Sequence, residues 1–298
     1  MKNQALSMNK LPITVVMLTL NEEFHLGDAI DNVKDWAEEI IIIDSLSTDR
    51  TVDIALDKGV KIIQRAFTNF GDQWNFALKN LPIKTKWTLK MDPDERLTEE
   101  VKRDIARICK QNEAFTAYEV SFRLWFMGKP LKVRLKNIVR LWQTGKVTFT
   151  EVLVNEHIET EGDVGKIKGF IEHYDIRDMH QWVEKQNVYT TMEAIRILNK
   201  LSLAAKPNFF GSRRERTMFI KKIFYQIPFR YQLLWLHRFF VRGAWRSGSN
   251  GFYWASARVI VAKMVEYKYK EGLITGRLPE VASSNKTGKP DIRVEYYD

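Results

Sequence analysis

The stretch K-M-D-P-D-E, Lys90 to Glu95, places three carboxylates directly after an apolar run. Asp92 and Asp94 are two residues apart, and Pro93 stiffens the bend between them. Two carboxylates in such a turn can present oxygens to one hard cation, because Mg²⁺ and Mn²⁺ prefer carboxylate, water and phosphate oxygens. Such a cation could bridge to a diphosphate and neutralise charge on a leaving group. The motif alone leaves a solvated turn open as the alternative.

The elements that must position this turn alternate along the first half of the chain. Continuous apolar, β-branched runs predict strands, and helical patterns separate them, which indicates an α/β fold with a mostly parallel sheet covered on both faces. Ser47, Thr48 and Asp49 are candidates to cap the second helix. The predicted strands are 13–18, 39–44, 60–65 and 86–91, and the predicted helices begin near Leu26, Thr51 and Gly71.

Polar residues cluster where each predicted strand ends, and ligands of parallel sheets bind beyond the carboxyl ends of the strands. One pocket at one sheet edge would collect all four clusters. They are Thr19, Asn21 and Glu22; Asp44, Ser45, Ser47 and Asp49; Arg65; and Asp92 with Asp94. The D-x-D nucleophile of haloacid-dehalogenase phosphatases is a weaker interpretation, because that motif ends a first strand and is followed by Thr or Val.

Six segments, in order, resemble the family 2 glycosyltransferases of the GT-A fold, and especially the bacterial lipopolysaccharide core glycosyltransferases. Together they cover about residues 12–200. Two departures are Pro93, where the family usually has Ala, and Asn155, where it usually has His. The matching segments are TLNEE, IIIDSLSTDRTVDIA, FGDQWNFAL, LKMDPDE, VNEHIE and EHYDIRD.

The resemblance implies a metal-dependent, inverting transfer of a sugar from a nucleotide-diphosphate donor, a UDP-sugar before others, to a glycan or lipid-linked hydroxyl. It implies Mg²⁺ or Mn²⁺ at Asp94 and Asp92, with His173 as a possible third ligand, and Glu156 as the base that removes the acceptor proton. Nucleotide-sugar contacts are expected from the remaining cluster residues. These are Thr19, Asn21, Glu22, Asp44, Ser45, Ser47, Gln73, Asn75, Asp92 and Arg140.

Several of these residues have plain structural alternatives. Asp44 could make a helix-entry hydrogen bond, Gln73 and Asn75 could be surface residues, and Glu156 could be a solvated strand charge. A lone His at a strand end, such as His173, is more often structural, and Arg140 could form a surface ion pair.

Charge is unevenly distributed. Residues 1–120 carry 16 Lys and Arg against 20 Asp and Glu, whereas residues 206–270 carry 14 against two, with 16 aromatic residues among them. This composition favours helices in the interface of an anionic membrane. A small helical cap and a single-stranded nucleic-acid site are alternatives, of which nucleic acid is the least expected.

The predicted organisation is a GT-A domain at 12–200, a basic aromatic helical membrane-associating region at 201–278 and a polar tail at 279–298. Within it, a hairpin is expected around Gly128 and a long helix from Asp178 to Leu201. The single cysteine, Cys109, suits a reducing cytoplasm, and we expect a protein peripheral to the inner face of the cytoplasmic membrane. A polyprenyl-phosphate sugar synthase, or a non-catalytic sugar-nucleotide or nucleic-acid binder, are the competing functions.

Overall fold

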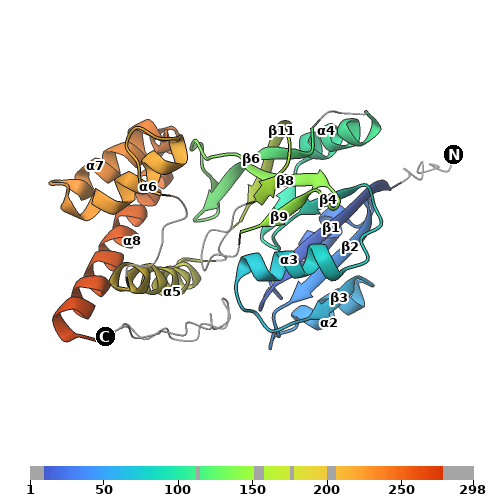
Figure 1. Ribbon diagram of the computed structural model, residues 1–298, viewed down its shortest axis with the longest axis horizontal. Coiled ribbons are helices and arrows are strands. Elements are labelled where there is room, and N and C mark those ends of the chain that lie inside the picture. Colours follow the sequence, from blue (N-terminus) through green and yellow to red (C-terminus); the bar gives the residue numbers. More distant parts are fainter. Residues whose placement is uncertain (1–9, 112–114, 151–157, 175–177, 200–205, 278–298) are drawn as a thin grey trace. The chain divides into compact units, whose positions relative to one another are not determined.

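The computed structural model describes residues 10–111, 115–150, 158–174, 178–199 and 206–277. They divide into two compact units, and the division falls within a strand, after Arg123. The first unit contains residues 10–123 and 136–174, and the second contains 124–135 and 178–277. Figure 1 labels the larger helices and many of the strands of both units.

The first unit is built on a mixed sheet. Among the described residues its strands run in the order β3-β2-β1-β4-β8-β6-β11-β5, and a short pair, β9 and β10, lies apart from it. The bounds are β1 Leu11–Thr19, β2 Ala37–Asp44, β3 Lys61–Gln64, β4 Trp87–Lys90, β5 Glu95–Leu97, β6 Ala117–Phe126, β8 Ile138–Gln143, β9 Val147–Phe149, β10 Ile158–Thr160 and β11 Val164–His173.

The four strands predicted from the sequence form the parallel part of this sheet. β1 pairs in parallel with β2 and with β4, and β2 pairs in parallel with β3. Ile13, Val15 and Val16 of β1 are fully buried, as expected of a strand covered on both faces. Beyond β4 the pairing turns antiparallel, first with β8. The expected α/β class with a mixed, mostly parallel sheet is confirmed.

Four helices accompany the sheet of the first unit. α3 lies against β1 and β9, and α4 lies against β1 and β11. A cap of Asn69 on Asp72 N begins α3, and a cap of Thr98 on Val101 N begins α4. The helices are α1 Leu26–Val33, α2 Thr51–Asp57, α3 Phe70–Asn80 and α4 Glu99–Lys110.

The predicted capping of α2 is wrong. Its N-cap is Arg50, and no side chain there accepts a capping hydrogen bond. Asp49 instead accepts from Thr51 N at 2.9 Å and from Thr51 Oγ1 at 2.5 Å. Ser47 and Thr48 are used in the loop before the helix, because their polar groups bond to β1–α1 loop residues and to Asp44.

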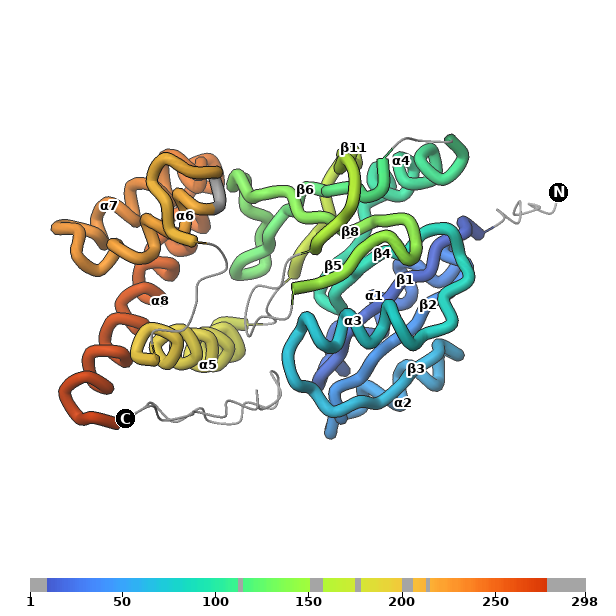
Figure 2. The backbone as a smooth tube through the Cα atoms, in the orientation of Figure 1, coloured from blue at the N-terminus to red at the C-terminus, as the bar shows by residue number. Residues whose placement is uncertain are grey.

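The second unit is helical (Figure 2, yellow to red). β7 pairs with the end of β6, at Trp125 and Phe126, which gives the predicted hairpin around Gly128. α7 continues into a π-helical turn, η2. The elements are β7 Lys129–Pro130, α5 Met179–Leu198, α6 Arg213–Ile223, η1 Phe224–Gln226, α7 Arg230–Leu236, η2 His237–Val241, η3 Ala244–Ser247 and α8 Gly248–Thr275.

The compact units divide the chain elsewhere than the predicted boundary at residue 200. α5 packs with α8, because Lys268 Nζ of α8 donates to Asn187 O, Thr190 Oγ1 and Thr191 Oγ1 at 2.7 to 2.9 Å. Residues 124–135 join the same unit. Asn250 Nδ2 donates to Phe126 O at 2.9 Å. The core there contains Phe126, Leu131, Trp182, Ala244 and Trp254.

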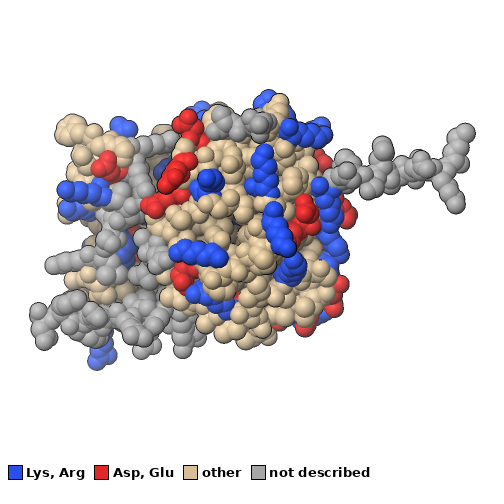
Figure 3. All heavy atoms as spheres, turned by 45° about the vertical axis from the view of Figure 1, so that its right-hand side comes forward, with Lys and Arg blue, Asp and Glu red and all other residues tan. Residues whose placement is uncertain are grey.

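Charged side chains of both signs are interspersed on the face shown in Figure 3. The excess of basic over acidic residues is concentrated in another part of the chain. Residues 216–265, all within the second unit, carry nine Lys and Arg and no Asp or Glu. Among the described residues, no helix is long and apolar enough to span a membrane.

Candidate functional site

The acidic turn follows the carboxyl end of β4 and leads into β5. Met91 N donates to Val16 O of β1 at 3.2 Å, and Glu95 N donates to Asp92 O at 2.9 Å, which closes a four-residue turn over Asp92–Glu95. Asp92 N in return donates to Glu95 Oε2 at 3.0 Å. The turn therefore has a single defined shape, held by its own backbone and one carboxylate.

Arg96 holds the backbone of this turn from outside. Its guanidinium donates to Pro93 O at 2.6 Å and Glu95 O at 2.7 Å, and a second nitrogen donates to His25 O at 3.0 Å. Arg96 thus connects the acidic turn to the loop that follows β1. Sequence reasoning missed this role, because a lone Arg after a carboxylate has no distinguishing pattern.

Arg140 of β8 holds the carboxylates themselves. Its Nη2 donates to Asp92 Oδ2 at 2.9 Å and to Glu95 Oε1. Arg140 is 5% exposed and Glu95 is fully buried, so this is a buried ion pair and not the surface pair considered as the alternative. Its Nη2 is engaged by the turn, whereas its Nε is buried with no hydrogen-bond partner among the described residues. Arg140 therefore positions the turn, and its expected contact with a donor stays a prediction.

The two carboxylates that share Arg140 respond to it differently. Burial raises the pKa of Glu95 to about 7, although the Arg140 charge acts in the opposite direction. Partial burial of Asp92 would also raise its pKa, but the charges of Arg140 and Lys90 outweigh burial and hold that pKa below its ordinary value. Asp92 is therefore the member of the pair that stays ionised at neutral pH.

Asp94 and His173 lie together on the other side of the turn. In the antiparallel pair of β5 and β11, His173 is opposite Glu95, and Tyr174 N donates to Asp94 O at 2.9 Å. This register brings His173 Nε2 to 3.3 Å from Asp94 Oδ2. The two predicted metal ligands, 79 residues apart in sequence, are thus side by side.

The donor set fits a divalent cation that a ligand helps to hold. Among the described residues no three His, Cys, Asp or Glu side chains are already grouped as a metal site. Mg²⁺ is usually bound through one or two carboxylates and substrate phosphates and seldom by an all-protein cage. If a metal binds here, Asp94 and Asp92 would supply the carboxylates, and His173 would supply an imidazole that Mn²⁺ accepts.

Asp44, at the end of β2, is the centre of the second polar cluster. It is fully buried and accepts hydrogen bonds from Thr19 Oγ1 at 2.9 Å, Ser47 N at 2.8 Å and Gln64 Nε2 at 3.0 Å. Thr19 and Asp44 are also partners in the register of β1 and β2. β1, which lies between β2 and β4, thus sets this cluster and the acidic turn at the same edge of the sheet.

The loops around Asp44 are tied to one another. Asn21, in the left-handed region at φ 55°, donates its backbone N to Ser47 Oγ at 2.8 Å and accepts from Thr48 N at 2.8 Å. Glu22 N donates to Thr51 Oγ1 at 2.7 Å. An Asn tolerates positive φ better than most residues. The structure therefore gives Asn21, Glu22 and Ser47 at least a loop-ordering role, and their contacts with a donor stay a prediction.

Gln73 and Ser45 lie beside this cluster. Gln73 is fully buried, accepts from Arg65 Nη1 and donates to Ser45 Oγ at 3.2 Å. Arg65 in turn donates to Asp72 at 2.6 Å. Gln73 is thus not the plain surface residue of the alternative, and it connects α3 to the polar edge.

Asn75 points elsewhere. Its Nδ2 donates to Phe149 O, and its Oδ1 accepts from Phe149 N, both at 2.9 Å. This paired arrangement holds β9 against α3, and a contact of Asn75 with a donor stays a prediction. Glu156 and Asn155 lie outside the described residues, and the assignment of the base stays a prediction.

Lys90 is a site residue that sequence reasoning missed. It is 8% exposed and lies 4.6 Å from the Trp74 ring centroid and 5.4 Å from that of Phe149. A cation held on two aromatic faces directly before the acidic turn adds positive potential where a diphosphate would arrive. The only available signal was a charged residue at the end of an otherwise apolar strand.

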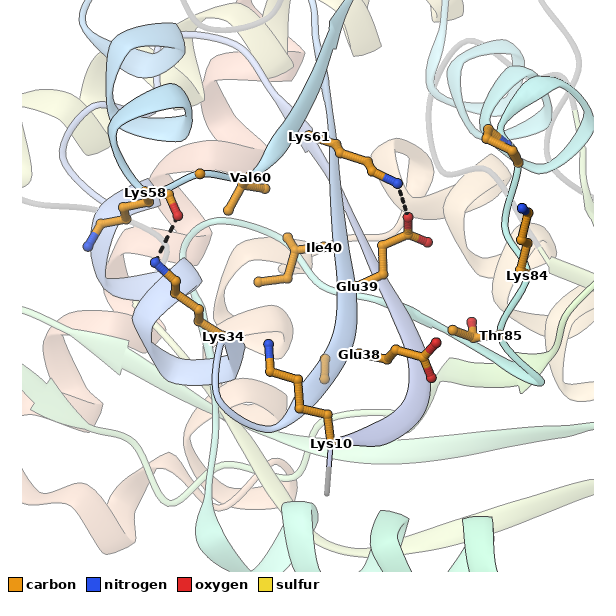
Figure 4. Close-up of a pocket in the computed structure, with 13 residues that line it drawn as sticks. Lys10, Lys34, Glu38, Glu39, Ile40, Lys58, Val60, Lys61, Lys84 and Thr85 are labelled. Atoms are coloured by element: carbon orange, nitrogen blue, oxygen red, sulfur yellow. Dashed lines mark hydrogen bonds and ion pairs between the residues drawn. The ribbon is translucent and has the colours of Figure 1, made fainter. Parts of the chain in front are cut away.

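A pocket of about 460 Å³ lies at the opposite edge of the sheet (Figure 4). It is formed around the amino ends of β2 and β3, and its lining includes Lys10, Lys34, Glu39, Lys58 and Lys61. Lys61 is paired with Glu39 at 2.5 Å. Parallel sheets bind ligands at their carboxyl ends, so this hollow is not the candidate site.

Comparison with known proteins finds a match over the part of the chain that forms this polar edge. A family model described as glycosyl transferase family 2 matches residues 14–133, which contain both the Asp44 cluster and the acidic turn. A lipopolysaccharide core biosynthesis glycosyltransferase of Rhizobium meliloti is 27% identical over 269 residues, covering 87% of this chain and 92% of that protein. An uncharacterised glycosyltransferase of Rickettsia typhi is 27% identical over 196 residues, 61% of this chain and 66% of that protein.

Solved structures share a smaller part of the chain. Glucosyl-3-phosphoglycerate synthase of Mycobacterium tuberculosis, in complex with UDP, is 21% identical with a TM-score of 0.32, over 38% of this chain and 45% of that one. Mannosyl-3-phosphoglycerate synthase of Rubrobacter xylanophilus is 17% identical with a TM-score of 0.33, over 38% and 40% of the two chains.

Proposed function

We propose that the chain is a glycosyltransferase of family 2 and that it transfers a sugar, with inversion, from a nucleotide-diphosphate donor to a hydroxyl of a lipid-linked or cell-surface glycan. A UDP-sugar is the favoured donor. The observation that carries the proposal is the acidic turn, in which Asp94 meets His173 at 3.3 Å at the sheet edge that also carries Asp44.

The nucleotide would occupy the cluster around Asp44. Thr19, Ser45 and Ser47 surround that carboxylate or its loop, and Gln73 reaches Ser45 from α3. Asn21 and Glu22 lie in the loop that closes over the same edge. Hydrogen-bonding groups already fixed by the fold cost little to order when a ligand binds, which favours affinity.

The diphosphate would lie at the acidic turn. Asp94 and Asp92, with His173, would hold Mg²⁺ or Mn²⁺, which supplies charge stabilisation for the departing diphosphate. Arg140 and Lys90 assist through the protein alone, because their charges keep Asp92 ionised. Arg96 fixes the backbone on which these carboxylates stand.

Transfer requires a base on the acceptor side. The acceptor oxygen attacks the anomeric carbon from the face opposite the leaving group, its proton passes to a carboxylate, and the bond to the nucleoside diphosphate breaks. We assign the carboxylate to Glu156, on the resemblance of VNEHIE to the family segment. Attack from the opposite face gives the inverted product.

The relative of nearly equal length supports a proposal for the acceptor class. Its name places it in lipopolysaccharide core biosynthesis, and we propose a core or related surface glycan as the acceptor here. Such acceptors are built on lipid, so we also propose that the enzyme works at the inner face of the cytoplasmic membrane, held by its basic second unit.

Thermal shifts with UDP, GDP, CMP and dTDP sugars, each with Mn²⁺ or with EDTA, test the donor side. We expect one nucleotide to stabilise the chain, and to do so much more with Mn²⁺ than with EDTA. Equal shifts in Mn²⁺ and EDTA would remove the cation from the proposal, and no shift with any donor would remove the nucleotide site.

A further inference from the structure

One face of α7 and η2 is apolar and exposed. Leu233 and Leu236 of α7 and Phe240 of η2 follow each other at intervals of three and four residues, which places them on one side of a helix. Phe229 is the residue directly before α7. The exposed fractions of Phe229, Leu233, Leu236 and Phe240 are 75%, 52%, 45% and 56%. These four residues, named here the α7 stripe, form a continuous apolar row that no described residue of the second unit covers.

The opposite face of the same helix contacts α8. Tyr231 donates to Glu266, and Trp235 Nε1 donates to Ser256 Oγ at 3.1 Å. These two hydrogen bonds fix which side of α7 faces outward. Phe229 itself adopts φ 53°, a left-handed conformation that is uncommon for a bulky residue, and its exposed ring begins the stripe.

An apolar groove of about 500 Å³ lies next to the stripe, between α7 and α8. Leu236 belongs to both, and Ile260, also in the lining, is 53% exposed. The lining includes one charged residue, Lys263. Exposed apolar patches on this scale mark surfaces that meet a protein or a membrane.

The charge around this surface selects the partner. Residues 216–265 include nine cations and no carboxylate. These cations repel one another. Burial and the charges of Arg258 and Arg242 lower the pKa of Arg238 to about 10. An anion brought to this region would reduce the repulsion among these three guanidinium groups.

We propose that the α7 stripe seats the second unit in the interface of an anionic lipid bilayer, with the surrounding Lys and Arg residues meeting lipid phosphates. This rests on the membrane location proposed above and assigns it to a surface. Apolar side chains enter the headgroup–acyl boundary while cations of the same unit bind anionic lipid. The groove between α7 and α8 would take part of an acyl chain.

Two other occupants fit less well. A second copy of this chain would place the same cationic surface against itself, because a two-fold interface is self-complementary, and like charges would repel. A single-stranded nucleic acid would stack on aromatic rings, but it gives no reason for the aliphatic Leu233 and Leu236.

Flotation of the full chain with vesicles tests the proposal. The probes are vesicles of phosphatidylcholine alone and of phosphatidylcholine with phosphatidylglycerol. We expect flotation with the anionic vesicles and little with the neutral ones. Leu233→Ser combined with Phe240→Ser should weaken partitioning by about tenfold or more, since burial of apolar side chains drives interfacial binding. Both residues are exposed, so the fold should tolerate the change.

Matched controls separate the stripe from general hydrophobicity and from charge. Leu56→Ser, on α2 of the first unit, removes a side chain with 60% exposure and should float as the wild type does. Lys221→Glu with Lys222→Glu, on the exposed side of α6, should reduce flotation with anionic vesicles and leave the stripe intact.

Three results would overturn the proposal: a stripe variant that floats like the wild type, a wild type that ignores anionic vesicles, or a wild-type dimer that the stripe variant converts to a monomer without lipid. Binding of the wild type to a single-stranded oligonucleotide, lost in the stripe variant, would assign the surface to nucleic acid instead. The shift of the stripe variant with UDP and Mn²⁺ is measured in parallel. It should be unchanged, so loss of flotation and loss of donor binding remain distinguishable.

Discussion

Asp94 is part of the acidic turn, and Arg140 of β8 binds this turn. The two charged residues have different roles. Asp94 is the carboxylate beside His173 that a ligand-borne cation would meet. Arg140 lies behind the turn, 5% exposed, and neutralises Asp92 and Glu95 from within. Substitutions at the two positions should therefore change different observables.

Asp94→Asn should remove the metal-dependent part of donor binding. The amide keeps the size of the side chain but withdraws the negative charge, so the extra stabilisation by UDP with Mn²⁺ over EDTA should vanish. Sugar transfer should fall by about a hundredfold or more, since charge stabilisation of the leaving group is lost. Glu99→Gln, an exposed carboxylate at the start of α4, is the control. A variant with an undiminished Mn²⁺ effect would exclude Asp94 as a ligand.

Arg140→Met should destabilise the fold itself. The change leaves the fully buried Glu95 without its cation, and breaking a buried pair from one side costs about 3 kcal/mol or more in the free energy of unfolding. Urea unfolding measures it. Combining Arg140→Met with Glu95→Leu should recover part of that loss, because the fully buried carboxylate is gone. Recovery should be incomplete, because Asp92 loses its cation and Asp92 N loses its acceptor. A single variant as stable as the wild type would contradict the buried pair.

Elements show how far the sequence alone leads. The apolar runs predict β1, β2, β3 and β4 because a strand buried on both faces leaves a continuous signal in the sequence. Polar residues at their ends then indicate the site edge. Pairings such as Arg140 with Glu95 and Asn75 with Phe149 are not predictable in this way, since they join residues 45 and 74 positions apart. Register, which local pattern does not encode, creates them.

Gly251→Ala in α8 should be destabilising, against the usual preference of helices. Alanine normally stabilises a helix interior relative to glycine by about 1 kcal/mol. Here a Cβ would collide with the carbonyl oxygen of Ala244 in η3. Gly27→Ala in α1 is the matched control, because its Cβ would meet Lys58 and Ile54 only at 3.5 and 3.8 Å. Thermal melting should lower Tm for the first and leave it equal or higher for the second.

Glu266 links α7 to α8 through Arg230 at 2.6 Å and also binds Lys270 and Tyr231. Burial alone would raise its pKa, but these hydrogen bonds lower it to about 2. A depressed carboxylate pKa contributes stability above its ordinary value of 4.5, and that stability is lost as pH falls towards 2.

The free energy of unfolding of the wild type should therefore decline between about pH 4.5 and pH 2 more steeply than that of Glu266→Gln. At neutral pH the variant should be less stable than the wild type, because Arg230 and Lys270 lose their charged partner. Urea titrations across this pH range measure both. Parallel pH profiles would show that the Arg230 pair does not contribute.

At the scale of the whole molecule, the compact units are not consecutive in sequence. Residues 124–135, from the first half of the chain, share a core with Trp182 of α5 and Trp254 of α8. Basic and aromatic residues become frequent after about residue 200, and this change in composition predicts a boundary there. Charge reflects which residues face solvent and not which helices pack together. Packing follows apolar contacts instead, which is why α5 groups with the later helices.

A chain ended after Asn199 should not fold cleanly. It would keep Phe126, Leu131 and Trp182 and lose the Ala244 and Trp254 side chains that cover them. We expect aggregation, or stronger binding of a hydrophobic dye than the full chain gives. A soluble truncated chain that binds no more dye than the full chain would mean that these side chains do not need the residues after Asn199 to cover them. Surface substitutions are thus the sounder test of membrane binding.

His173 of β11 lies directly opposite Glu95 of β5. This pairing constrains how many residues can be inserted into β11. Side chains of a strand alternate between faces, so inserting one residue between Gly165 and His173 would turn the imidazole away from Asp94, whereas inserting two would return it to the same side. Insertion or deletion of an even number of residues in this strand should therefore be tolerated. An odd number should abolish activity although no residue of the site is substituted.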